Sequence, residues 1–582
     1  RVAAVSALLA LVGSGLLGVL VAVLALGVRS VQQRRAPVLA LAQARGAGPL
    51  RMRSVMILEG LLVAVPAGAV AIGLAAVLLP LDPGPAGWLL PIAATATVPV
   101  LFAVLTPTRL AGRDREDLTV GARSSTRWIL EAVVIGLAAV SLFLLARRGL
   151  VGTSAVVGVD PLLAAMPVLL AAAVCVVVLR IYPAPMLAVQ AAARRSRSAT
   201  GLVGAARAVR APALGFAAVL ALVVGVAVVV ASITLATTVR AALERTAVEA
   251  VGADLRVEAA NLPDEVLDTI RAADGVTAAA GVAIVDGVQF RDEAGNDELF
   301  AVVADTEALH EVRDDLPVLT AATGAVQIAA ADDWAEDIVG TELQLAGAPA
   351  SLAAVLPVDA IPGVTRTWAL VDSSALEQLD IDPPVVRQVL VRLSSDADAE
   401  AVGAVLDELV REAQQTDTAG SAVVVTSAEG ELAAATAAPT VGGLERFLLL
   451  AAAAALLLTV LAVLLTSITG AKARGRLVAV LRVLGLNRRQ VRRLLTWELA
   501  PVTITAAIVG TGLGLVLPLI IATALDLRPF VGGRVQPGLV VDPLWVLAGV
   551  GAFLLTVLLA GAVAAAIGRR IVPAGALKMG DA

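Results

Sequence analysis

The chain has 582 residues, of which 59% are hydrophobic and only 16% charged, and its mean hydropathy is +0.90. Soluble globular proteins carry about 25% charged residues, so this composition excludes an ordinary soluble protein. The formal net charge is −5, and we expect membrane lipid as a partner and no nucleic acid.

Apolar runs of about 20 residues predict helices that span a membrane. The chain contains nine such runs, at Val2–Val28, Ser54–Leu79, Trp88–Leu105, Trp128–Ala146, Pro161–Leu179, Ala211–Thr237, Phe447–Ile468, Leu499–Leu525 and Pro543–Ile567.

The distribution of basic residues between these runs predicts their orientation, because cytoplasmic loops are enriched in Lys and Arg. If the C-terminus is cytoplasmic, 28 of the 44 Lys and Arg residues lie in cytoplasmic segments. Those segments are 29–53, 106–127, 180–210, 471–493 and 568–582. Nine spans would then place Arg1 outside, so we expect at least one further span upstream, in a parent chain of about ten spans.

A stretch between the sixth and seventh runs, residues 239–443, has a different composition. It holds 37 Asp and Glu, ten Arg and no Lys, and the topology places it outside. Strands are expected at "ADLRVEA", "ELFAVVA" and "RQVLVRL", helices at "LPDEVLDTIRAADG" and "DADAEAVGAVLDELVREA", and a hairpin at "TELQLAGAPASLAAVLP". These patterns predict a mixed α/β domain, followed by a helical stalk over 427–446.

The acidic charge of this domain has two interpretations. It could form a surface for cationic ligands, or it could be a solvated face that keeps an exported domain soluble. We favour the second, because the acids are spread along the stretch and do not match the spacing of a calcium loop. The lone His310 and lone Cys175 predict neither a metal site nor a disulfide.

Two basic stretches resemble each other at a shift of 439 residues. "QARGAGPLRMRSVMILEGLLV" at 43–63 is a weaker copy of "VLRVLGLNRRQVRRLLTWELA" at 480–500. The shift aligns Arg35 with Arg474, Gly46 with Gly485, Arg53 with Arg492 and Glu59 with Glu498. Each copy is interpreted as a span, a basic turn, an amphipathic helix, a Gly, a short basic helix and a Glu at the start of the next span.

The stretch 474–518, "RGRLVAVLRVLGLNRRQVRRLLTWELAPVTITAAIVGTGLGLVLPL", resembles the FtsX-like permease family, the MacB and LolC/LolE type of ABC transporter subunit. The ending "RRIVPAGALKMG" at 569–580 is similar to the closing segment of that family. The resemblance implies a polytopic α-helical protein of the bacterial inner or plasma membrane, with two pseudo-symmetric repeats and an extracytoplasmic mixed α/β domain.

The family's plan implies these domains: 1–110, an incomplete first repeat; 111–205, a linker with two spans; 206–238, the first span of the second repeat; 239–443, the exterior domain; and 444–582, the remaining second repeat. It also implies that the basic helices lie along the cytoplasmic membrane face and dock onto an ATPase. The implied coupling residues are Arg45, Gly46, Arg51, Arg53 and Glu59 in the first copy, and Arg482, Gly485, Arg488, Arg489, Arg492, Arg493 and Glu498 in the second.

The first copy departs from the pattern, since Pro49 stands where the second copy has Arg488. We therefore expect weaker docking there. Basic residues beside a span also attract anionic lipid and fix orientation, and these roles alone are the alternative explanation.

The chain contains no G-x-x-x-x-G-K-[ST] phosphate-binding loop, so we expect neither an enzyme nor a bound cofactor. ATP would be bound by a separate ABC ATPase, present in two copies. The resemblance leaves two functions open: export or extraction of a lipid, lipoprotein, peptide or drug, or transmission of a mechanical signal to an exterior partner such as a lipoprotein or cell-wall hydrolase. The sequence does not identify the cargo.

Overall fold

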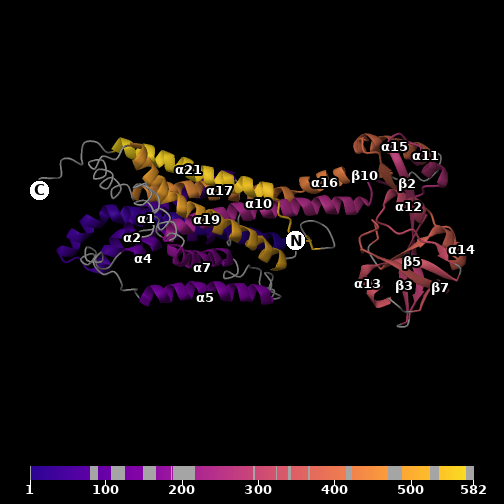
Figure 1. The fold of residues 1–582 in the computed structure, drawn as a ribbon, viewed down its shortest axis with the longest axis horizontal. Coiled ribbons are helices and arrows are strands. Elements are labelled where there is room, and N and C mark those ends of the chain that lie inside the picture. The colour runs from indigo at the N-terminus through magenta and orange to yellow at the C-terminus, as the bar shows by residue number, and fades with distance from the viewer. Residues whose placement is uncertain are drawn as a thin grey trace. The chain divides into compact units, whose positions relative to one another are not determined.

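The computed structural model (Figure 1) describes residues 2–78, 89–106, 125–148, 165–184, 187, 216–292, 295–322, 324–338, 342–364, 367–414, 423–469, 488–524, 528 and 536–571. It divides into two compact units. Unit 1 comprises 1–238, 445–527 and 538–582, and unit 2 comprises 239–444 and 528–537.

Each of the nine predicted spans coincides with a helix. Their bounds are α1 (Val2–Ala44), α2 (Pro49–Leu78), α4 (Leu89–Leu105), α5 (Ser125–Arg148), α7 (Met166–Ile181), α10 (Phe216–Val251), α17 (Pro439–Thr469), α19 (Arg488–Ala524) and α21 (Pro543–Ile571). Seven of them are long and apolar enough to cross a membrane, while α4 and α7 are apolar but shorter. The prediction of a polytopic helical membrane protein is confirmed.

Helix α10 forms the centre of unit 1. Of its most apolar stretch 72% is buried, as expected for a helix that is hydrophobic on all sides. Gly510 and Gly514 of α19 lie directly against α10, so closely that an added Cβ would come within 2.7 Å of the Val223 carbonyl oxygen and 2.8 Å of the Ala227 carbonyl oxygen, respectively. Small residues at this spacing let helix backbones approach closely where no water drives their association.

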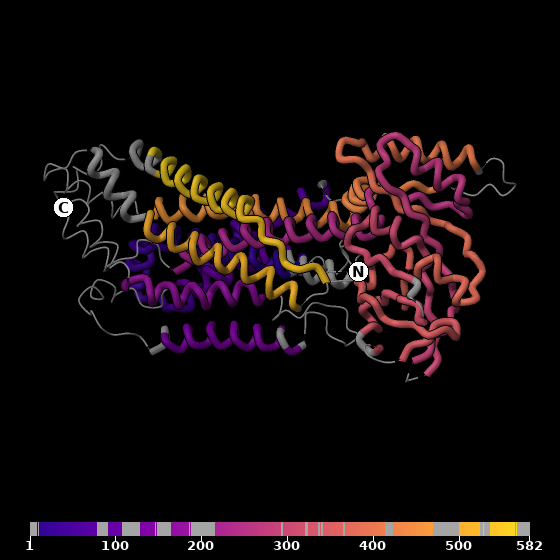
Figure 2. The backbone as a smooth tube through the Cα atoms, turned by 45° about the vertical axis from the view of Figure 1, so that its right-hand side comes forward, coloured from indigo at the N-terminus to yellow at the C-terminus, as the bar shows by residue number. Residues whose placement is uncertain are grey.

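Helix α5 lies along the outside of the other membrane helices (Figure 1 and Figure 2). Its side chains are largely exposed, with Ile129, Leu130 and Phe143 each more than half accessible. Helix α7, its packing partner, is by contrast closely packed on α1, because Gly18 of α1 leaves room for Val168.

Unit 2 contains a split β-α-β-β-α-β arrangement. Strands β1 (Leu255–Glu258), β2 (Val276–Arg291), β9 (Gln388–Leu393) and β10 (Val424–Ser427), with helices α11 (Asp264–Arg271) and α15 (Ala399–Gln414), form an antiparallel sheet in the order β10-β1-β9-β2. This order is that of the ferredoxin-like fold. Both helices cover one face, where Ile270 and Leu406 are fully buried against Leu255 and Val391.

The remaining strands are inserted between β2 and β9. They are β3 (Asn296–Ala304), β4 (Ala321–Ala322), β5 (Ala325–Ala331), β6 (Leu343–Leu345), β7 (Ala348–Leu356) and β8 (Trp368–Asp372). The sheet continues β2-β3-β8-β5-β7-β6, and β6 pairs back onto β2, which closes a barrel. The 16-residue strand β2 belongs to both parts. Trp368 is fully buried, and its indole N–H donates to the Val358 carbonyl at 3.0 Å.

The structure confirms the predicted mixed α/β character of this unit. The expected hairpin is β6–β7, which turns through Ala346 (φ 48°) and Gly347 (φ 85°), as in a type I′ turn. The expected stalk over 427–446 is helical except at Ser427, the last residue of β10, and at Ala438, which separates α16 (Ala428–Ala437) from α17.

The carboxylate of Asp372, the last residue of β8, links this strand to the segment that follows β3. Asp372 Oδ2 accepts from the N–H of Thr306 (3.0 Å) and from its hydroxyl (2.6 Å), and Asp372 Oδ1 accepts from the N–H of Ser374 (2.9 Å). Burial would raise the pKa of Asp372, but the hydrogen bonds from Ser374 and Thr306 outweigh it, so the pKa lies below its usual value.

We expect Asp372→Ala to destabilise unit 2 by about 1–2 kcal/mol at neutral pH, since the partly exposed carboxylate makes several charge-assisted hydrogen bonds. A lowered folded-state pKa means that this stabilisation is complete at neutral pH and is lost below about pH 4. Hydrogen exchange of β8 in the intact protein at pH 7 and pH 3 measures it. The exposed Asp382→Ala is the control, and equal effects of both variants would contradict the assignment.

Candidate functional site

The first basic segment forms the tip of a hairpin between α1 and α2. The α1 helix does not end at Val28, where the apolar run ends, but continues to Ala44. It stops in a Schellman motif: Ala47 N–H donates to the Ala42 carbonyl (3.0 Å), and Gly46 N–H donates to the Gln43 carbonyl (2.9 Å). Gly46 has φ 89°, a left-handed conformation that favours glycine.

This geometry corrects the expected basic turn after the first span. Residues 29–44 add about 24 Å of helix beyond Val28, at 1.5 Å per residue. Chain reversal then takes only the four residues 45–48 before α2 begins at Pro49. The first copy is therefore a continuous helix with a sharp hairpin, rather than a separate helix between two turns.

Polar contacts hold α1 and its neighbours together below the tip. Arg35 Nη2 lies 2.8 Å from Glu59 Oε1, and the Gln32 amide lies 3.2 Å from Thr106 Oγ1 at the end of α4. Glu59 is thus paired, which removes the cost of a lone carboxylate at the start of a span. Next to these contacts, Val28, Leu39, Met56 and Phe102 form an apolar cluster.

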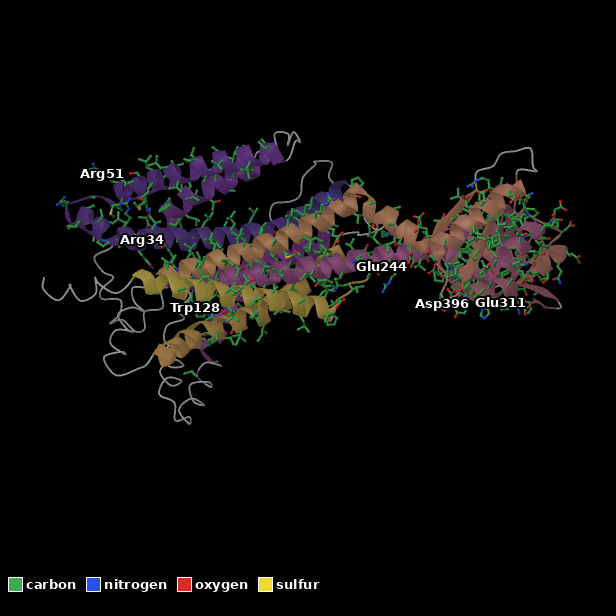
Figure 3. All side chains as sticks on the ribbon, turned by 90° about the horizontal axis from the view of Figure 1, so that it is seen from above. Arg34, Arg51, Trp128, Glu244, Glu311 and Asp396 are labelled. Carbon is green, nitrogen blue, oxygen red and sulfur yellow. The ribbon has the colours of Figure 1, made fainter. Side chains whose placement is uncertain are left out.

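The predicted residues of the first copy differ in accessibility. Arg45 and Arg51 are exposed, and Figure 3 shows Arg34 and Arg51 near the hairpin end. Arg53 is half-buried, and its buried Nε has no hydrogen-bond partner within the described structure. Arg53 is therefore less accessible than Arg45 and Arg51.

The structure adds apolar residues that the sequence pattern did not single out. Leu50 is 79% exposed and Leu41 is 60% exposed. Together with Arg45 and Arg51 they give the tip a mixed apolar and basic surface. The sequence signal was Leu50 itself, a large apolar residue directly after the breakers Gly46, Gly48 and Pro49.

The second copy is described only in part. Arg482 and Gly485 lie outside the described residues, and for Arg488, Arg489, Arg492, Arg493 and Glu498 the structure describes the backbone alone, as the first three turns of α19. Helix α19 starts at 488 and α2 starts at 49, positions that the shift of 439 makes equivalent. In both copies the Glu is the eleventh residue of its helix.

An ion pair between the linker helices was missed by the sequence analysis. Arg180 of α7 binds Glu131 of α5 through Nε (3.0 Å) and Nη2, and its guanidinium lies 3.7 Å from the centre of the Trp128 ring. The signal was present in the sequence, because Glu131 interrupts an apolar run one turn after a boundary Trp. Its partner lies on another helix and could not be identified from spacing.

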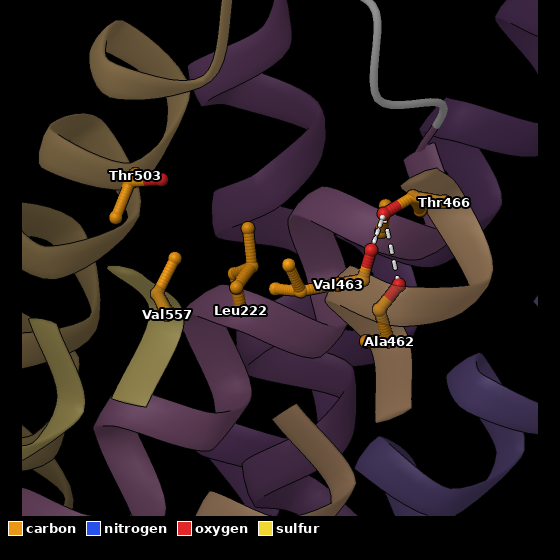
Figure 4. Close-up of a pocket in the computed structure, with 7 residues that line it drawn as sticks. Leu222, Ala462, Val463, Thr466, Thr503 and Val557 are labelled. Carbon is orange, nitrogen blue, oxygen red and sulfur yellow. Dashed lines mark hydrogen bonds between the residues drawn. The ribbon is translucent and has the colours of Figure 1, made fainter. Parts of the chain in front are cut away.

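A small crevice lies among α10, α17, α19 and α21 (Figure 4), and its cavity volume is only about 10 Å³. Apolar side chains such as Leu222, Val463 and Val557 line it, with the hydroxyls of Thr466 and Thr503. Thr466 donates to the carbonyls of its own helix (Ala462 and Val463, both 2.9 Å). Within the described ranges, no group of three or more metal-ligating side chains occurs here or elsewhere.

Comparison with known proteins adds a family for part of the chain. Residues 449–573, which include most of α17 and all of α19 and α21, match the model described as FtsX-like permease C-terminal. This confirms the resemblance drawn from the second copy. No match was found among curated proteins.

Two solved structures are similar to part of the chain. One is the periplasmic region of MacB from Actinobacillus actinomycetemcomitans, with 10% identity, a TM-score of 0.25, and coverage of 31% of this chain and 92% of that one. The other is the extracellular domain of the noncanonic ABC-type transporter YknZ from Gram-positive bacteria, with 14% identity, a TM-score of 0.23, and coverage of 29% and 99%.

Proposed function

We propose that this chain, an FtsX-like permease over residues 449–573, is the membrane subunit of an ABC transporter. It would couple ATP hydrolysis by a separate cytoplasmic ATPase to movement of unit 2 on the outer face. Its cargo would be a lipid, lipoprotein, peptide or drug.

The observation that carries the proposal is the repeated helical start. In both copies a basic segment, a Glu and a span share one helix, and the two helices begin at equivalent positions. Topology alone requires basic residues but no such repetition. Two equivalent docking elements would suit two copies of a separate ATPase, which would supply the phosphate-binding loop that this sequence lacks.

The test compares charge reversal in the two copies. We expect Arg488→Glu with Arg489→Glu to weaken ATPase binding at least tenfold, because charge-assisted contacts contribute about 1.5–3 kcal/mol each when partly buried. Arg45→Glu with Arg51→Glu, the exposed pair of the first copy, should weaken it less. The measurement is ATPase activity that co-purifies with each variant from membranes of the source cells.

Membrane insertion and orientation serve as controls, since other cytoplasmic arginines remain in every variant. The purified chain alone should hydrolyse no ATP. Turnover by the isolated chain, or unchanged ATPase recovery with both double variants, would contradict the proposal and leave the arginines as lipid anchors.

A further inference from the structure

Among the described strands of unit 2, β10 is the one strand longer than two residues that lies at an open edge of the sheet. At one end β6 pairs with β2 and closes the barrel, and at the other end β10 pairs with β1 alone. The two-residue β4 is also paired on one side only. Within the described residues, strand β10 (Val424–Ser427) therefore presents its outer backbone N–H and C=O groups without a neighbouring strand.

Natural proteins usually protect such an edge with charged residues, proline or a bulge, or by keeping the strand very short. Strand β10 is short, with four residues, but lacks the other devices. Residues 423–427 read "VVVTS" and contain none of these residue types. The register with β1 is regular, from Leu255 with Ser427 to Glu258 with Val424. Val425 packs towards α15, near Gly403, whereas Val424 is 47% exposed. The edge is thus chemically suited to accept another strand.

The charges around the β10 edge indicate which charge a bound peptide strand should carry. Glu429 and Glu431 follow β10 in the first turn of α16, and no ion pair to either occurs in the described part of the chain. Glu258 and Arg256 of β1 pair with each other, as do Arg411 and two acids of α15. With 37 acids against ten arginines in residues 239–443, a second copy of this unit would be repelled, and a basic segment attracted.

We propose that β10 binds an extended Lys/Arg-rich peptide segment, which adds as a further strand to the sheet. Backbone hydrogen bonds to Val424–Ser427 would supply register, and an apolar residue of the peptide would cover Val424. The basic residues of the peptide would form ion pairs with Glu429 and Glu431. This interaction does not depend on coupling to an ATPase.

The test uses the full chain in lipid nanodiscs and a fluorescent peptide of alternating Lys and Val, eight residues long. Binding measured by anisotropy should weaken with salt, and hydrogen exchange should slow at 424–427. Val424→Lys should reduce affinity at least tenfold, because it places a like charge on the edge. Val405→Lys, at an exposed position of α15, adds the same charge away from the edge and should change affinity less than threefold.

Two further peptides separate strand pairing from general attraction. A Glu/Val peptide should not bind, and a Lys/Val peptide carrying central prolines should bind at least tenfold more weakly, since proline removes backbone donors. Equal binding of the proline peptide, or equal loss in both Lys variants, would overturn the proposal in favour of bulk charge. Concentration-dependent protection of 424–427 without peptide would overturn it in favour of pairing between two copies.

Discussion

Replacing Gly510 or Gly514 by Ala should destabilise the membrane unit by about 1–3 kcal/mol each, the usual range for overpacking. The added methyl group would meet the Val223 carbonyl oxygen at 2.7 Å or the Ala227 carbonyl oxygen at 2.8 Å. Backbone atoms of a central helix cannot rotate away as a side chain does, so α19 must move off α10. The unfolding temperature in detergent should fall accordingly.

The same helix supplies a matched control. Gly512 has nothing within 4 Å of an added Cβ, so Gly512→Ala should be neutral or slightly stabilising, because Ala favours helix. The single cysteine of the chain, Cys175, is fully buried on α7, and thiol labelling during heating reports opening of the unit. Equal labelling curves for Gly510→Ala and Gly512→Ala would show that the close packing is absent.

Removing one member of the Glu131–Arg180 pair should destabilise the α5–α7 hairpin by about 2–3 kcal/mol. Each of the variants Glu131→Leu and Arg180→Leu breaks this ion pair in a segment expected to lie in the membrane. Trp128→Leu should cost less, about 1 kcal/mol, because it removes only the stacking on Arg180. Cys175 labelling again provides the measurement.

The double variant Glu131→Leu with Arg180→Leu distinguishes an ion pair from general damage. Because it removes both charges together, it should recover most of the stability that either single change loses. Additive loss in the double variant would mean that the two side chains act independently.

The sequence predicted those features that depend on local composition. Each apolar run is long enough to mark a helix, so all nine spans were found, including the short α4 and α7. Strands β1, β3 and β9 were found because short stretches that contain apolar and β-branched residues lie between turn signals. The Gly-based turn between β6 and β7 was equally local.

The features that were missed depend on partners distant in the chain. Closure of the barrel requires Phe290 of β2 to pair with Leu345 of β6, which no local pattern specifies. Helix α1 continues past Val28 because Leu39 and Val28 pack with Met56 and Phe102. Tertiary contacts therefore stabilise helix beyond the end of the apolar run. For the predicted coupling residues, the sequence gives the charge, whereas the partial burial of Arg53 and the exposure of Leu50 depend on packing between helices.

The nesting of one β-structure inside another has a consequence for biosynthesis. Strand β1, which contains Leu255, has no neighbouring strand until Val391 and Ser427 have been synthesised. All strands of the barrel, β2 to β8, are synthesised between β1 and β9. Such long-range pairing slows folding, because the chain loses the entropy of closing a long loop before the stabilising contacts form. The barrel should therefore assemble first. The ferredoxin-like sheet of β1, β2, β9 and β10 exposes its apolar strand faces until then, so it is the part most in need of chaperones during export.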